Sequence, residues 1–511
     1  MSHAHGLDFA IVVGYLAVMS ALGLRYWRRQ TTTESYFVAK RVLPAWALGM
    51  SMLATMISSV TFVAYPGSSY GKDWSLLVPG FMLIAVLPLV GQVIIPFYRE
   101  AIGVSAYEYF ERRFGKPVRL YSACAFSLAH FSKMGFVLYL MALTLASISG
   151  WNVEILIYGA AAVMIFFAVL GGIEAVVWAD VIQGFVMGVS ILITLGFLFF
   201  LPPGGPGAIF DKAIAAHKFG LGSLEWNFAR PTIPVLLLYG LFWYLQRYVA
   251  DQTLVQRYLM ARSDREAFNG AKVGAFLSVP VWALFMLIGT CVWAFLQVTG
   301  EPIPASITKA DQMFPFFLGR HLPTGVLGLL FACLTGSAMT MLAGDLNSMS
   351  VVAAEDFYRT FRPAATDRER LAAAKVFVVL TGVATIGVAL LLVQTKASAL
   401  SIWFAVSGIA SGGLMGLFFL AFLSRRAHRR GVYCGIAACL VFSVWAALTK
   451  GASPLVNLGN WNFPYDELLI GVIGNVLLFV VGGLVSYLLP RESAAQPRTL
   501  WNWRETRASL K

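Results

Sequence analysis

Charged residues are scarce in this sequence of 511 residues, where Asp, Glu, Lys and Arg together make up 12% of the chain. An ordinary soluble domain carries about 25% charged residues. Hydrophobic residues make up 59% of the chain instead. The composition therefore excludes an ordinary soluble globular protein.

Cysteine and histidine are also scarce. The five cysteines all lie in apolar segments, without the spacing of metal ligands and without a paired arrangement, so we interpret them as packing residues. His130 is the histidine that lies inside an apolar segment. An enzyme within the membrane would need a nucleophile with its base, or a metal cluster. Neither pattern is present, so we predict that the chain is not an enzyme.

What the sequence does have is a series of apolar runs of about 20 residues or more, each long enough to cross about 30 Å of hydrocarbon. These runs predict an all-α polytopic membrane protein with thirteen transmembrane helices. The expected segments are 7–25, 46–71, 76–98, 118–147, 152–171, 177–200, 232–256, 274–298, 323–352, 373–393, 399–424, 432–449 and 466–489.

The net charge of +13 is distributed unevenly between the loops. With thirteen crossings, 28 of the 38 Lys and Arg residues fall on one side and eight on the other. Basic residues concentrate on the cytoplasmic side of membrane proteins. We therefore predict an outside N-terminus and a cytoplasmic C-terminus, and we expect the partners to be the lipid bilayer and a small solute rather than nucleic acid. No obligate protein partner is evident.

One lysine, Lys133, lies within the apolar run LAHFSKMGFVLYLMALTLA. A cation near the middle of a bilayer costs about 2.5–3.5 kcal/mol on insertion scales, so it usually faces a partner, a cavity or a substrate. Lys133 is therefore a candidate functional residue.

The second segment predicts an interrupted helix. Four hydroxyl residues stand close together there, and Pro66-Gly67 follows them; the four are Thr55, Ser58, Ser59 and Thr61. A break at membrane depth frees backbone carbonyls, and transporters use such breaks to bind ions. The alternative is that these hydroxyls bond back to their own helix.

Other polar residues lie in separate apolar segments. Asp345 is in the ninth, Asp180 in the sixth, and the seventh contains Gln246, Arg247 and Asp251. Arg247 and Asp251 are four residues apart and have the spacing of a helical ion pair. Either they pair with each other, or all these charges share a polar interior.

Six blocks of sequence, in order, resemble the sodium:solute symporter family, and bacterial sialic acid symporters most of all. The blocks are GYLAVMSALGLRYWRRQTTTESYF, ATMISSVTF, SAYEYFERRF, GGIEAVVWADVIQG, DQTLVQRYLMARS and LNSMSVVAAEDFYR. The resemblance covers about Leu7 to Leu489 and implies a LeuT-type fold of two inverted five-helix repeats in the plasma (bacterial inner) membrane. The implied parts are an extra N-terminal helix and loop (1–45), the first repeat (46–200), an outside loop (201–231), the second repeat (232–424), two C-terminal helices (425–489) and a cytoplasmic tail (490–511).

The resemblance also implies a sodium site. Its ligands would be the backbone carbonyls of Ala54, Ile57 and Ser337 and the hydroxyl of Thr340. Met341 stands where the family has a further hydroxyl. A second sodium site, built in the sialic acid members around Asp180 and Thr340, would need hydroxyls at two positions that are Ala343 and Gly344 here. We therefore expect one sodium ion, with the second site lost.

Asp345 lies one helical turn after Met341 and has three open interpretations. Its carboxylate either supplies the oxygen missing from the cation site, or makes coupling depend on protons, or neutralises Lys133 or Arg247.

For the substrate, the resemblance implies Ser58, Ser59, Thr61 and Gln246 as hydrogen-bonding residues. Lys133 stands where the sialic acid members carry an arginine that holds the carboxylate, and Gly80 replaces a polar residue. The expected function is therefore sodium-coupled import of an acidic sugar such as sialic acid, or another organic acid, by alternating access. The alternatives are a neutral sugar or polyol, a proton-coupled or weakly sodium-coupled transporter, and a solute sensor.

Overall fold

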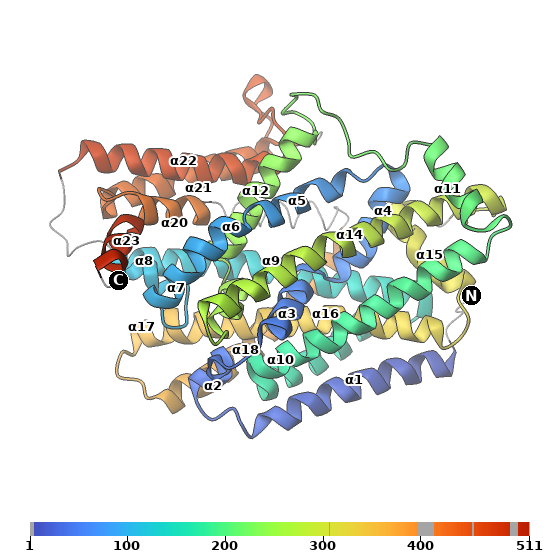
Figure 1. The fold of residues 1–511 in the computed structure, drawn as a ribbon, viewed down its shortest axis with the longest axis horizontal. Helices are drawn as coiled ribbons and strands as arrows, with labels where there is room; N and C mark the ends of the chain where they lie inside the picture. Colours follow the sequence, from blue (N-terminus) through green and yellow to red (C-terminus); the bar gives the residue numbers. More distant parts are fainter. Residues whose placement is uncertain (1–4, 306, 396–412, 452–453, 491–498, 510–511) are drawn as a thin grey trace.

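The computed structural model describes the chain except for residues 1–4, 306, 396–412, 452–453, 491–498 and 510–511. The described residues form a bundle of helices that run roughly side by side (Figure 1). Among the described residues, ten helices are long and apolar enough to cross a membrane, and counting one bent pair of helices as a single span gives eleven. The prediction of an all-α polytopic protein is therefore confirmed.

The ten spanning helices follow the expected segments closely. They are α1 (Gly6–Trp27), the continuous run η2 to α7 (Ser75–Ala101, which includes α5, Val78–Ala85), α9 (Lys116–Ser149), α10 (Val153–Phe200), α12 (Ile233–Ala250), α14 (Asp264–Thr299), the run α16 to α17 (Val326–Phe361, which begins with α16, Val326–Val351), α18 (Asp367–Gln394), α21 (Arg429–Thr449) and α22 (Leu468–Leu488).

Helix α10 contains two of the expected segments. Its 48 residues are interrupted at Gly172, whose backbone has φ +57° and ψ −170°. Glycine adopts this conformation without steric cost, and the parts on either side are each long enough to cross a bilayer. The expected segment 399–424 is represented by α20 (Leu414–Leu423), and its earlier residues lie outside the described ranges. The count of thirteen crossings thus stays a prediction.

The shorter helices lie in the connections. They are α2 (Thr33–Val38), η1 (Ala39–Arg41), α8 (Glu108–Phe114), α11 (Gly205–Ala215), α13 (Gln252–Leu259), η4 (Ala310–Gln312), α15 (Met313–His321), η6 (Gly459–Trp461) and α23 (Leu500–Ser509). Helix α11 lies within 201–231, the segment that we expect to form an outside loop. In the C-terminal helix α23, the Trp501 indole donates a hydrogen bond to the Leu423 carbonyl at 2.8 Å.

The helix break expected in the second segment is present. Helices α3 (Ala45–Met56) and α4 (Ser59–Gly71) meet at an angle of 60°, with Ile57 and Ser58 extended between them. The Ser58 hydroxyl accepts from the Val60 amide at 3.2 Å, and the Ser58 amide donates to Thr61 Oγ1 at 3.3 Å. This capping box starts α4. The break is therefore made by hydroxyl residues, and not at Pro66, which lies inside α4.

A second break separates α12 from α13 at Asp251, which has extended backbone. The Asp251 carboxylate caps α13 by accepting from the Thr253 amide at 2.9 Å. The Ala250 carbonyl, left free at the end of α12, accepts from the Tyr107 hydroxyl at 2.9 Å. A carbonyl released by a break in a membrane helix needs such a partner. The first helix of each expected repeat is thus interrupted.

Helix α16 is buried along nearly its whole length, and it packs against α1, α9, α10 and α18. Helices α20, α21 and α22 pack together at one side of the bundle (Figure 1). The two interrupted helices and α16 therefore bring the polar residues of distant segments together.

Candidate functional site

A cavity of about 280 Å³ opens between the two interrupted helices, α9 and α14. Such a volume accommodates a small solute rather than a macromolecule. The lining combines hydroxyls, charged groups and aromatic rings. The polar and charged lining residues are Thr55, Ser58, Thr61, His130, Lys133, Gln246, Arg247 and Asp251.

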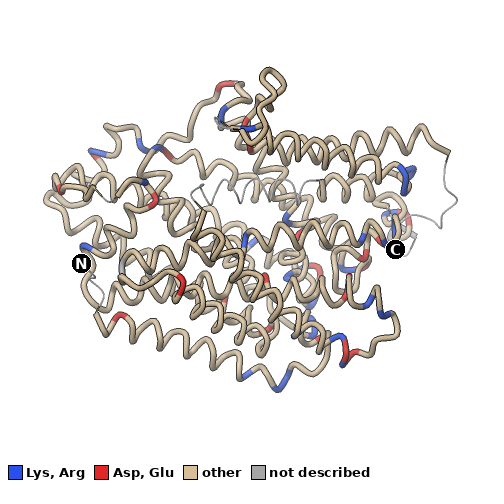
Figure 2. Tube along the Cα trace, turned by 180° about the vertical axis from the view of Figure 1, so that it is seen from behind, with Lys and Arg blue, Asp and Glu red and all other residues tan. Residues whose placement is uncertain are grey.

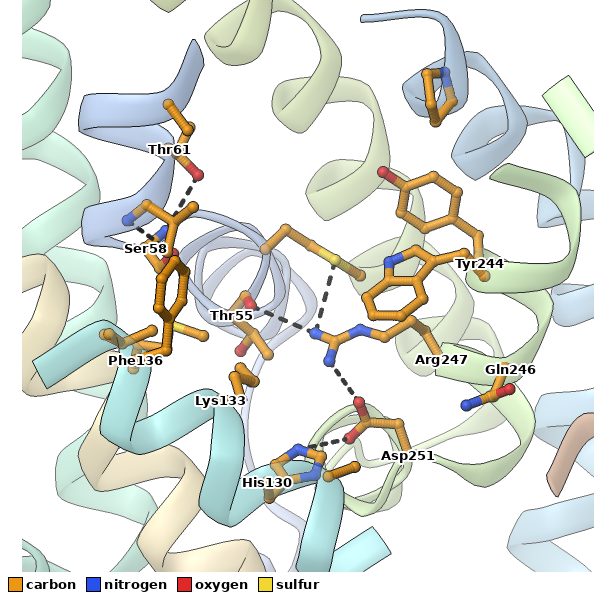
Figure 3. Close-up of a pocket in the computed structure, with 18 of the residues that line it drawn as sticks. Thr55, Ser58, Thr61, His130, Lys133, Phe136, Tyr244, Gln246, Arg247 and Asp251 are labelled. Atoms are coloured by element: carbon orange, nitrogen blue, oxygen red, sulfur yellow. Dashed lines mark hydrogen bonds and ion pairs between the residues drawn. The ribbon is translucent and has the colours of Figure 1, made fainter. Parts of the chain in front are cut away.

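The break between α3 and α4 supplies the hydroxyls of the cavity. Ser58 and Thr61 line it, and Figure 3 shows both at the start of α4. Ser59, expected with them, does not line the cavity. It is fully buried, and its hydroxyl donates to the Val137 carbonyl of α9 at 3.1 Å. Consecutive residues of a helix point in different directions, so Ser59 joins α4 to α9 instead.

Lys133 lines the cavity and forms an ion pair with Asp345 of α16. The ammonium nitrogen is 2.9 Å from Oδ2 and 3.1 Å from Oδ1. The lysine side chain is 12% exposed and the aspartate 1%. Of the three interpretations of Asp345, this contact corresponds to the neutralisation of Lys133.

Arg247 and Asp251 also form an ion pair, which is the first of the two alternatives left open by the sequence. The guanidinium additionally donates to the Thr55 carbonyl at 3.3 Å, which is one of the last carbonyls of α3 (Figure 3). A cation at a helix C-terminus is stabilised by the free carbonyls there. Arg247 therefore links the two interrupted helices.

His130 lies between the two aspartates. Its Nδ1 is 3.1 Å from the Phe126 carbonyl and donates to it. Its Nε2 is 3.7 Å from Asp251 and 3.8 Å from Asp345, beyond hydrogen-bond distance from both.

Gln246 of α12 lines the cavity, as expected. Its side-chain oxygen accepts from Asn475 of α22 at 3.4 Å. One of the two C-terminal helices therefore holds the orientation of a residue in the cavity wall.

An aromatic wall, not expected from the sequence, completes the cavity. Tyr65, Tyr244 and Trp282 line it, and the Trp282 ring lies 6.0 Å from that of Tyr65 and 6.2 Å from that of Tyr244. A Cβ placed on Gly80 would be 2.9 Å from the Trp282 ring. The indole thus takes the space that a side chain at position 80 would need. Its Nε1 is buried and has no hydrogen-bond partner in the described part of the protein.

Two of the expected sodium ligands meet at the first break. Ser337 of α16 donates its hydroxyl to the Ile57 carbonyl at 3.3 Å, which places α16 against the break, and the Ala54 carbonyl accepts from the Ile57 amide at 3.3 Å. Thr340 is buried one turn further along α16, whereas Met341 lines the cavity. Carbonyl and hydroxyl oxygens suit a small hard cation.

Asp180 lies in a different buried environment, beside Arg257 of α13. Ser51 donates to Asp180 Oδ2 at 2.6 Å and accepts from Arg257 Nε at 2.9 Å, and the guanidinium is 3.5 Å from the same carboxylate oxygen. The Thr340 side chain also interacts with Asp180. A Cβ on Gly344 would be 2.8 Å from the guanidinium. The guanidinium can therefore occupy this position because residue 344 has no side chain. The sequence reasoning did not identify Arg257 as a partner of Asp180.

Comparisons with known proteins agree on one family. A family model described as the sodium:solute symporter family matches residues 36–439. A sodium/sialic acid symporter of Aliivibrio fischeri is 30% identical over 94% of this chain and 93% of its own length. A second, from Proteus mirabilis, is 30% identical over 94% of this chain and 95% of its own. The structure of a Na⁺-coupled sialic acid symporter, substrate-bound and outward-open, superposes with a TM-score of 0.88 at 29% identity, covering 96% of this chain and 99% of that one.

Proposed function

Because this chain belongs to the sodium:solute symporter family, it is a multi-pass membrane transporter that couples solute import to sodium, and we propose that its solute is a small organic acid. An acidic sugar such as sialic acid is the leading candidate. One observation carries this proposal: Lys133, a cationic residue within the membrane-spanning bundle, lines the cavity.

The cavity matches an acidic sugar in three ways. Lys133 attracts a carboxylate as a point charge, although it lacks the two-pronged geometry of arginine. Ser58 and Thr61 supply hydrogen-bonding groups. Aromatic rings offer an apolar surface to the C–H face of a sugar ring. A lining of aromatic rings with a few polar groups is usual for a small-molecule site.

A neutral sugar or polyol is the second candidate, and one specific observation favours it. Lys133 already has a carboxylate partner in Asp345, so its charge is balanced before any solute enters. A neutral solute would use the hydroxyl and aromatic groups and leave this ion pair intact.

Uptake into proteoliposomes tests the function. We expect purified protein to accumulate radiolabelled sialic acid when sodium is higher outside than inside, and unlabelled glucuronate to compete with it. Uptake should be absent when choline replaces sodium on both sides. Competition by glucose but not by the acids would favour the neutral solute instead.

We further propose that sodium binds at one site, formed by the Ala54, Ile57 and Ser337 carbonyls and the Thr340 hydroxyl. The contact between Ser337 and Ile57 supports this site. The guanidinium of Arg257 supports the absence of a second one, because it already places a positive charge beside Asp180. We also propose that the C-terminus lies in the cytoplasm. Figure 2 shows Lys and Arg concentrated at the end of the bundle that holds the C-terminus, and basic residues concentrate on the cytoplasmic side of membrane proteins.

A single site predicts a simple dependence of transport on sodium. We expect initial uptake rates, measured against sodium concentration at saturating solute, to fit a Hill coefficient of about 1, because one bound ion changes the affinity without cooperativity. The ratio of ²²Na⁺ to solute taken up should agree with this value. Two sodium ions per solute would contradict the assignment of Arg257 as a fixed cation.

A further inference from the structure

The charged groups around the cavity are balanced before a solute binds. Lys133 and Arg247 contribute two positive charges, and Asp345 and Asp251 two negative charges. Arg257 also interacts with Asp345, and it is itself paired with Asp180. With the His130 ring in its neutral form, the net charge of these groups is therefore zero.

An acidic solute disturbs this balance. Both carboxylate oxygens of Asp345 lie against the Lys133 ammonium, at 2.9 and 3.1 Å, so a solute carboxylate shares or replaces this contact. In either case the cavity gains one negative charge. Charges interact strongly in a medium of low dielectric constant, and an uncompensated one is costly there.

A sodium ion at the first break is placed to offset that charge. Thr55, Met56 and Ser58 line the cavity on both sides of Ile57, so the expected sodium site adjoins it. Helix α16 contributes to both places, with Ser337 at the break and Asp345 at Lys133.

We propose that Asp345 is a positioning residue that makes the binding of an acidic solute depend on sodium. It neutralises Lys133 in the empty transporter, so that a solute carboxylate and a sodium ion enter together as a neutral pair. This inference rests on the proposed function, since it assumes that the solute is an acid that binds at Lys133.

The test compares acid binding with and without sodium. The dissociation constant of sialic acid is measured by titration calorimetry on the purified full-length protein, in sodium chloride and in choline chloride. For the wild type we expect sodium to tighten binding about tenfold or more. For Asp345→Asn we expect the sodium and choline values to be nearly equal, because Lys133 then has no carboxylate partner and binds the acid without sodium.

Two variants provide controls for Asp345→Asn. Asp345→Glu keeps the carboxylate and should keep the sodium effect. Asp211→Asn removes an exposed carboxylate on α11 and should behave as the wild type does. A role in stability alone would change the melting temperature of Asp345→Asn and leave the ratio of the two dissociation constants unaltered.

A second measurement needs no variant and applies even where Asp345→Asn does not fold. The methyl ester of sialic acid lacks the negative charge, so sodium should tighten its binding to the wild type much less than it tightens binding of the acid. An equal sodium effect on the acid and the ester, or an unchanged sodium effect in Asp345→Asn, overturns the inference. If no acid binds to the wild type in sodium, the proposed function itself fails.

Discussion

Replacing Lys133 by methionine together with Asp345 by asparagine is expected to reduce uptake of an acidic solute by about 100-fold or more. Losing one partner of a buried charge pair costs about 2–5 kcal/mol of binding, and each 1.4 kcal/mol is a factor of ten. The lysine alone should not be replaced. Asp345 is 1% exposed, and without Lys133 this buried carboxylate would lose the ammonium group that lies 2.9 Å from it. A buried charge left without its partner destabilises a protein by about 3–5 kcal/mol.

The double variant is measured by sodium-driven uptake and by thermal melting. Its melting temperature should stay near that of the wild type, because the two new side chains are neutral and similar in size to the originals. A matched control neutralises an ion pair far from the cavity, with Arg425→Met and Glu505→Gln; this pair is exposed. Exposed pairs contribute about 0–1 kcal/mol, so uptake by the control should be unchanged.

The same variant separates the two candidate solutes. A neutral sugar that binds through Ser58, Thr61 and the aromatic wall does not need the charge of Lys133. Full uptake of a neutral sugar by the double variant, with no wild-type uptake of acids, would therefore replace the acidic solute by a neutral one.

Features that depend on neighbouring residues could be predicted from the sequence. The apolar segments predicted the helices. The cluster of hydroxyl residues predicted the first break, because the capping of a helix is determined by a few neighbouring residues. The pairing of Arg247 with Asp251 was one of the two alternatives left open by the sequence. The second break could have been suspected from Asp251 followed by Thr253, although no Pro or Gly marks it.

Contacts between distant segments could not be predicted. Lys133 and Asp345 are 212 residues apart, and the sequence left three partners or roles open for the aspartate. Trp282 fills the space beside Gly80 because α14 packs against α5, which no local pattern reveals. The resemblance did indicate that the second sodium site lacks two hydroxyls. The group that lies beside Asp180 instead is the Arg257 guanidinium of α13, which is 77 residues away in the sequence, so no local pattern links the two.

That group, Arg257, gives the other large expected effect. Replacing Arg257 by methionine should lower the stability by about 3–5 kcal/mol, because the buried Asp180 carboxylate then loses its charged partner. The Ser51 hydroxyl would also lose its donor at 2.9 Å, and the Thr253 carbonyl one at 2.7 Å. Thermal melting of the purified protein measures the change. Adding Asp180→Asn to Arg257→Met should recover much of the lost stability, since no charge then remains unpaired.

Sodium should rescue the single variant if Arg257 takes the place of a cation. Without the guanidinium, the Asp180 carboxylate has Ser51 and Thr340 beside it, and these oxygens suit sodium. A ligand that binds only the folded state raises the melting temperature as its concentration increases. Sodium should therefore stabilise Arg257→Met more than it stabilises the wild type, and this additional effect should disappear in the double variant with Asp180→Asn. Equal stabilisation of all three proteins would show that Arg257 supports the fold alone, and that a fixed positive charge is not what limits this transporter to one sodium ion.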